Sequence, residues 1–243
     1  MTSEKRLARI AGLLYLIVAV AGGFSQLYVR SSVKVPGNAA ATADNISASA
    51  TLFRVGALTD LVNIVCFLVL GLILYGLLKP VSARAALAML VFNAVSVAVM
   101  TANMVNHLGA VLTATSADYA GAFGTRSSDA LAMLFLDLHA QGYLVAGIFF
   151  GLWLLPLGYL LVSSRAAPRA LGILVMVGAL GYVADAVANV LFPTVGATLT
   201  PVLVLPSALA EVSLVLWLLV KGLDVPPRVH HAAAPAEHVP ATV

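Results

Sequence analysis

Residues 52–78, LFRVGALTDLVNIVCFLVLGLILYGLL, decide the fold class, because this stretch is apolar over more residues than a bilayer core requires. A helix that crosses the hydrocarbon core needs about 20 mostly apolar residues. The stretch also carries Asp60 and Asn63, which a lipid-facing helix surface tolerates poorly. It therefore predicts a membrane-spanning helix whose polar side chains point toward other helices.

Stretches of the same character recur on both sides of this one. The chain is 61% hydrophobic and 9% charged, whereas soluble domains carry about 25% charged residues. We expect an all-α, polytopic integral membrane protein with a six-helix transmembrane domain over residues 1–222. The Pro- and Ala-rich tail, residues 223–243, is expected to be disordered. The predicted spans are 7–28, 52–78, 85–112, 130–162, 170–192 and 201–220.

Lysine and arginine are distributed unequally between the two sides of the predicted bundle. The richer side carries Lys5, Arg6, Arg9, Lys79, Arg84, Arg165, Arg169, Lys221 and Arg228, and the other side carries Arg30, Lys34, Arg54 and Arg126. The positive-inside rule then places both termini in the cytoplasm. Because the basic residues do not gather on one face, the sequence does not indicate a nucleic-acid partner. The single cysteine, Cys66, excludes an internal disulfide framework.

Polar residues recur in the half of the predicted spans that faces away from the cytoplasm. The rise of an α-helix places their ionisable members within about 15 Å of the outer helix ends. Each charged group at mid-bilayer costs about 2.5–3.5 kcal/mol on insertion scales, so we expect these groups to line an outward-facing intramembrane polar pocket. The residues are Asp60, Asn63, Asn103, Asn106, His107, Asp137, His139, Asp185, Asn189 and Glu211.

No lysine or arginine is expected deep in a span to neutralise the acids. The nearest, Arg54, lies on a different helical face from Asp60. The acids are then protonated, paired with histidines, or ligands of a divalent metal, with His107, Asp137, His139 and Asp185 as the candidate ligands. Carboxylate and imidazole suit Zn²⁺, Mn²⁺ or Fe²⁺. Since Asp137 and His139 are two residues apart, about 200° around a helix, they do not easily share one face.

The sequence leaves the function open among three classes. One is a protein that binds or moves a small solute, proton or ion through the polar pocket. Another is a membrane-embedded, metal-dependent hydrolase that acts on a hydrophobic substrate such as a lipid. The third is an accessory subunit without chemistry, whose polar residues only join helices by hydrogen bonds worth about 0.6–2 kcal/mol each. No Walker loop, nucleophile elbow or HExxH motif is present to indicate a particular reaction.

Many short segments, in the same order along the chain, resemble one known family. They include RIAGLLYLIVAVAGGFSQLYVR (9–30), LFRVGALTDL (52–61), LFLDLHAQGY (134–143), FFGLWLLPLGYL (149–160) and PRALGILVMVGALGYVAD (168–185). Over nearly all of residues 7–222 the sequence resembles the bacterial membrane family catalogued as domain of unknown function 4386. The resemblance implies a multi-pass protein of the bacterial plasma membrane, with its first helix retained and without an established activity. Asp60, Asp137, His139 and Asp185 fall within these segments.

Overall fold

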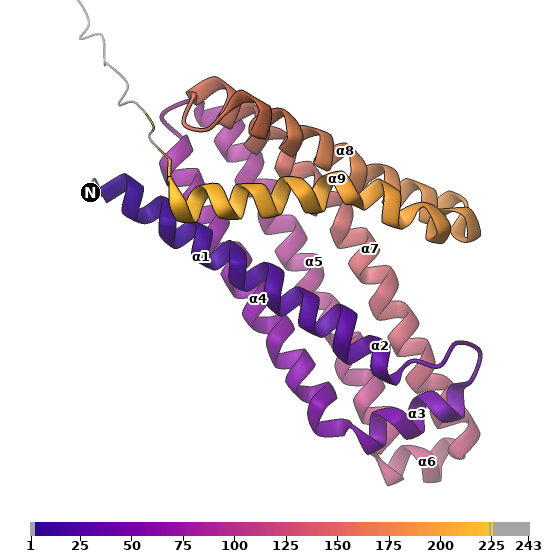
Figure 1. Ribbon diagram of the computed structural model, residues 1–243. Helices are drawn as coiled ribbons and strands as arrows, with labels where there is room; N and C mark the ends of the chain where they lie inside the picture. The colour runs from indigo at the N-terminus through magenta and orange to yellow at the C-terminus, as the bar shows by residue number, and fades with distance from the viewer. Residues whose placement is uncertain (1–2, 224, 226–243) are drawn as a thin grey trace, which may run out of the picture.

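The computed structural model describes residues 3–223 and residue 225, and every regular element in this part of the chain is helical (Figure 1). Six of its helical segments are long and apolar enough to cross a membrane, which confirms the all-α, polytopic prediction. The elements are α1 (Ser3–Gly23), the π-helical segment η1 (Phe24–Val29), α2 (Arg30–Val33), α3 (Ala39–Ala48), α4 (Ala50–Leu78), α5 (Ala83–Thr115), α6 (Ala117–Phe123), α7 (Thr125–Ser164), α8 (Arg169–Leu191) and α9 (Pro193–Val220).

The first crossing segment is longer than its apolar run. The sequence predicts an end at Tyr28, but α1, η1 and α2 form one continuous segment from Ser3 to Val33. A π-helical turn holds more residues than an α-helical turn and is frequent near functional sites. The hydroxyls of Ser31 and Ser32 donate to the carbonyls of Leu27 and Val29, so these polar residues are accommodated within the helix. As a result, Arg30 lies within the crossing segment rather than in a loop.

The crossing helices form a closed ring in the order α1, α4, α5, α7, α8 and α9, with α9 again in contact with α1. Figure 1 shows α3 and α6 together at the end of the bundle farthest from the N-terminus; we call this the loop end. At the opposite, terminal end, Arg9 Nη2 donates to the Val220 carbonyl at 3.2 Å. The beginning of α1 and the end of α9 therefore lie at the same end of the bundle. Its assignment to the cytoplasm stays a prediction.

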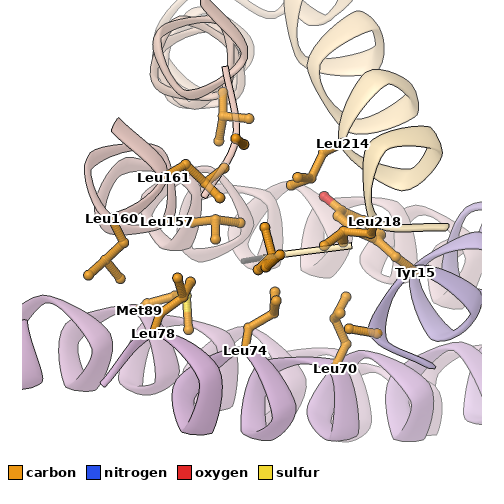
Figure 2. Close-up of a cluster of buried hydrophobic side chains, with 14 of the residues drawn as sticks. Tyr15, Leu70, Leu74, Leu78, Met89, Leu157, Leu160, Leu161, Leu214 and Leu218 are labelled. Carbon is orange, nitrogen blue, oxygen red and sulfur yellow. The ribbon is translucent and has the colours of Figure 1, made fainter. Parts of the chain in front are cut away.

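The terminal end of the ring is filled by apolar side chains. Figure 2 shows leucines from α4, α7 and α9 meeting Tyr15 of α1 and Met89 of α5. Leu223 and Val225 are also buried in this cluster. The rest of the predicted disordered tail, residue 224 and residues 226–243, lies outside the described residues.

Three asparagine side chains join neighbouring helices. Each donates a hydrogen bond to a backbone carbonyl of the next helix and lies against a glycine of that helix. Asn93 Nδ2 of α5 donates to the Phe67 carbonyl of α4 at 3.0 Å. Gly71, one turn further along α4, leaves room for the amide, because a Cβ there would lie 2.3 Å from Asn93 Oδ1. The full set of such pairs is Asn63 with Gly22, Asn93 with Gly71, and Asn103 with Gly142.

Replacing Gly71 with alanine is expected to destabilise the protein by about 1–3 kcal/mol, because the new methyl group displaces the Asn93 amide. Gly76 on the same helix is the matched control, since a Cβ at that position meets nothing within 4 Å. Its replacement by alanine is expected to be neutral or to stabilise by at most about 1 kcal/mol. Unfolding of both variants in detergent, followed by circular dichroism, checks the difference. Equal stabilities would contradict the proposed packing.

Candidate functional site

An ion pair is buried between the first and second crossing segments. Arg30 Nη2 donates to Asp60 Oδ2, with the arginine side chain 12% exposed and the aspartate fully buried. The Tyr143 hydroxyl of α7 donates to the other carboxylate oxygen at 3.1 Å, and the Arg30 guanidinium lies 5.0 Å from the centre of the Tyr143 ring. The expectation that no basic residue neutralises the acids is therefore wrong for Asp60. The basic partner is Arg30, which the hydropathy pattern assigned to a loop.

Two fully buried histidines lie beside this pair, His107 on α5 and His139 on α7. His107 Nε2 lies 3.0 Å from the Phe53 carbonyl, and His139 Nδ1 lies 3.1 Å from the Asn103 carbonyl. A carbonyl only accepts hydrogen bonds, so each of these nitrogens carries the proton in a neutral ring. The opposite nitrogens, Nδ1 of His107 and Nε2 of His139, then carry lone pairs, and neither has a hydrogen-bond partner.

Asp60, His107 and His139 form what we call the histidine–aspartate group. One carboxylate oxygen and one nitrogen of each ring lie within 4.8 Å of one another. The rings of His107 and His139 are packed edge to face at 5.4 Å between centroids. The Asn103 amide, in turn, donates to the His139 carbonyl at 2.8 Å, which holds α5 and α7 together at this position. Asn106 Nδ2 supports it by donating to Asn103 Oδ1 at 2.9 Å.

The other acidic metal candidates of the sequence lie elsewhere. Asp137 accepts a hydrogen bond from Lys34 Nζ at 2.6 Å, and both side chains are more than one-third exposed. Its separation from the buried His139 agrees with their spacing along the helix. Asp185 of α8 accepts from Thr200 Oγ1 at 2.5 Å and from Asn189 Nδ2 at 3.0 Å. The structure thus separates the predicted polar residues into distinct groups.

A partly open cavity of about 560 Å³ is lined by residues from each of the six crossing segments. Most of the lining is apolar, from residues such as Val18, Met100 and Phe150. Two carboxyls reach the cavity, Asp185 from α8 and Glu211 from α9, and no lysine or arginine belongs to its lining. The polar lining residues are Gln26, Asn63, Ser96, Tyr143, Tyr182, Asp185, Thr200 and Glu211.

Each carboxyl of the cavity is held by a neighbouring hydroxyl. The Tyr182 hydroxyl of α8 donates to Glu211 Oε1 at 2.6 Å, as Thr200 does to Asp185. These hydroxyls donate hydrogen bonds but carry no positive charge. A negatively charged carboxyl in this cavity would therefore need a cation to balance its charge. Tyr143 lines the cavity and also contacts Asp60, so this residue connects the cavity with the histidine–aspartate group.

Sequence reasoning missed the residues that complete both sites, namely Arg30, Tyr143, Tyr182 and Thr200. A signal was available for Tyr143, because it follows His139 by one helical turn and therefore lies on the same face. For Arg30, the apolar run ends two residues earlier, and composition alone gives no sign that the helix continues. Tyr182 and Thr200 become site residues only through the pairing of α8 with α9.

A closed ring of six apolar helices around buried polar groups defines a multi-pass membrane protein of the all-helical class. Within this class, the chain belongs to the family described as domain of unknown function (DUF4386), whose model matches residues 10–222. This match confirms the family resemblance of the sequence. A search of curated proteins and a search of solved structures gave no match.

Proposed function

We propose that the protein binds a small amphipathic cation in this cavity and moves it across the bacterial plasma membrane in exchange for protons. The observation that carries the proposal is the pair of carboxyls, Asp185 and Glu211, in an apolar cavity whose lining contains no basic residue. Ionisable side chains within membrane-spanning segments commonly mark substrate, ion or proton pathways. A positively charged solute would complement the charge of this lining, which has two carboxyls and no basic residue.

The size of the cavity suits an organic molecule rather than a bare ion. Pockets for small organic ligands have volumes of about 300–1,000 Å³, and this cavity holds about 560 Å³. Apolar side chains such as Val18, Met100 and Phe150 offer contacts to a hydrophobic body. A ligand with an apolar body and one positive charge thus matches both the walls and the carboxyls.

Protons are the ions that we propose the protein exchanges for this cation. An ionised carboxyl without a counter-ion is costly in a membrane interior, so the proposal requires protons to replace the cation when it leaves the cavity. A bound cation supplies the positive charge instead, so the cation and protons compete for the same cavity. Release of protons on binding, and their uptake on release of the solute, follow from this competition. The direction of movement and the outward opening of the cavity stay predictions.

A pair of probes of matched shape and opposite charge tests the binding step. Tetraphenylphosphonium is expected to bind the detergent-purified protein, and the isosteric anion tetraphenylborate is not. Glu211→Gln and Asp185→Asn are each expected to weaken binding of the cation by at least about tenfold, since each removes one charge of the complement. Asp137→Asn is the control, because that acid is half exposed and paired with Lys34 outside the cavity. Equal binding of both probes would overturn the proposal.

Movement is tested in liposomes that contain the purified protein. A proton gradient is expected to drive uptake of tetraphenylphosphonium above the passive rate, and Glu211→Gln is expected to remove this excess. Binding without any protein-dependent uptake would reduce the proposal to a solute-binding protein.

A metal-dependent hydrolase is a second candidate, favoured by Asp60, His107 and His139, because carboxylates and imidazoles are the ligands that hydrolytic zinc sites use. It predicts metal-dependent cleavage of an ester or amide in a lipid-like substrate. Loss of cleavage in His139→Gln, with the protein still folded, would support it. The accessory-subunit hypothesis gains if the cavity variants and the histidine variants all leave binding and cleavage unchanged.

A further inference from the structure

We propose that Asp60, His107 and His139 bind a divalent transition-metal ion of the Zn²⁺ type, at a site separate from the cavity carboxyls. Each residue offers one ligand atom, and these atoms already lie within 4.8 Å of one another. All of them are fully buried. Two imidazoles and one carboxylate are a ligand set that Zn²⁺ and Fe²⁺ sites share, with coordination positions left for water or substrate.

The hydrogen bonds of the histidines argue for metal ligands rather than for ordinary interior histidines. A metal-bound histidine usually donates its other ring N–H to a carbonyl or carboxylate, which fixes the ring and exposes one lone pair. Both rings have this arrangement, with His107 Nε2 on the Phe53 carbonyl and His139 Nδ1 on the Asn103 carbonyl. Buried polar atoms are rarely left without a partner. The partnerless nitrogens, His107 Nδ1 and His139 Nε2, are therefore the atoms that a metal would satisfy.

Hydrogen bonds also hold the carboxylate of Asp60 in place as a metal ligand. Tyr143 donates to Oδ1 and Arg30 to Oδ2, and ligating carboxylates are usually held by such outer hydrogen bonds. Each carboxylate oxygen has more than one acceptor position, so a hydrogen bond does not exclude a metal. The positive charge of Arg30, however, opposes a divalent cation at close range. Arg30 is therefore the counter-charge of the metal-free state and a competitor that weakens metal binding.

The site is independent of the proposed solute. The lining of the cavity contains none of Asp60, His107 and His139, although Tyr143 belongs to both surroundings. Metal binding therefore does not require the cavity carboxyls. Glu211→Gln should leave metal binding intact, and this result keeps failure of the metal proposal distinguishable from failure of the transport proposal.

Titration of the metal-free, full-length protein with Zn²⁺ in detergent tests the site. His230, His231 and His238 are replaced by alanine in every sample, and no histidine tag is used, so that only the two buried histidines remain. One equivalent of Zn²⁺ is expected to bind by calorimetry. Separate His107→Gln, His139→Gln and Asp60→Asn variants are expected to bind more than about 100-fold more weakly, beyond the cost of outer-shell changes. Asp137→Asn, two residues from His139, is the control and is expected to bind normally.

Arg30→Gln separates a metal site from a purely structural cluster. Because this change removes the competing charge, Zn²⁺ affinity is expected to increase by at least about tenfold. If Asp60→Asn alone fails to fold, the double variant Arg30→Gln/Asp60→Asn retains charge balance and is expected to lose binding. Absence of Zn²⁺ binding in both the parent and Arg30→Gln, with each eluting as a folded species, would overturn the proposal. Stoichiometric binding that survives a combined His107→Gln/His139→Gln change would overturn it as well.

Discussion

Replacing Asp60 with alanine is expected to destabilise the protein by about 3–5 kcal/mol, the largest effect of any single substitution that we propose. The change leaves the Arg30 guanidinium without its counter-ion in a side chain that is only 12% exposed. Breaking a buried ion pair by removing one partner costs this much because an uncompensated charge stays inside the protein. The Tyr143 hydroxyl loses its acceptor in the same step. Reversible unfolding in mixed detergents measures the difference.

Two controls show whether the lost stability comes from the unpaired charge. The double variant Arg30→Met/Asp60→Leu removes both charges and is expected to recover most of the stability, because apolar replacements of buried ion pairs are often neutral or stabilising. Asp137→Ala breaks the pair with Lys34, whose side chains are both more than one-third exposed. That change is expected to cost less than about 1 kcal/mol. A double variant as unstable as Asp60→Ala would contradict this explanation.

Sequence reasoning reached the fold because hydrophobic length is a local property. Residues 52–78, for example, correspond closely to α4, which begins at Ala50 and ends at Leu78. The first segment was predicted too short, since its last turns carry Arg30, which contacts α4 and α7, and serines that bond to their own helix. Hydropathy does not register such contacts. The prediction therefore placed a buried charge in a loop.

The candidate site was predictable in kind but not in arrangement. The cost of a lipid-facing charge was enough to predict that Asp60, Asp185 and Glu211 point inward, and each lies against other helices. Which acids share a site depends on the order of helices around the ring. Asp60 meets histidines because α4 adjoins α5 and α5 adjoins α7, whereas Glu211 meets Tyr182 because α9 adjoins α8. Neighbours of this kind are set by packing rather than by spacing along the chain.

Replacing Glu211 with leucine and Tyr182 with phenylalanine in one variant is expected to stabilise the protein by about 1–3 kcal/mol while abolishing binding of the cationic probe. The Tyr182 hydroxyl of α8 donates to the Glu211 carboxyl of α9 at 2.6 Å. Removing both partners together leaves neither member of this hydrogen bond unsatisfied, and such paired apolar replacements are near neutral or stabilising. A carboxyl within the membrane carries an insertion cost that leucine does not. Residues kept for function rather than stability behave in this way.

The side-chain amide of Asn63 joins two helices, so its replacement shows how the loss of a structural hydrogen bond changes stability. Comparison with the Glu211 variant then shows whether Glu211 has a structural or a functional role. Asn63 Nδ2 donates to the Val18 carbonyl at 2.8 Å beside Gly22, so Asn63→Leu is expected to destabilise by about 1–3 kcal/mol. If Glu211 also served only to join helices, Glu211→Leu/Tyr182→Phe would lower stability as Asn63→Leu does. Unfolding in detergent, with tetraphenylphosphonium binding measured on the same samples, distinguishes the two. Gain of stability with loss of binding would mean that Glu211 is retained for the ligand, because packing alone would favour its replacement.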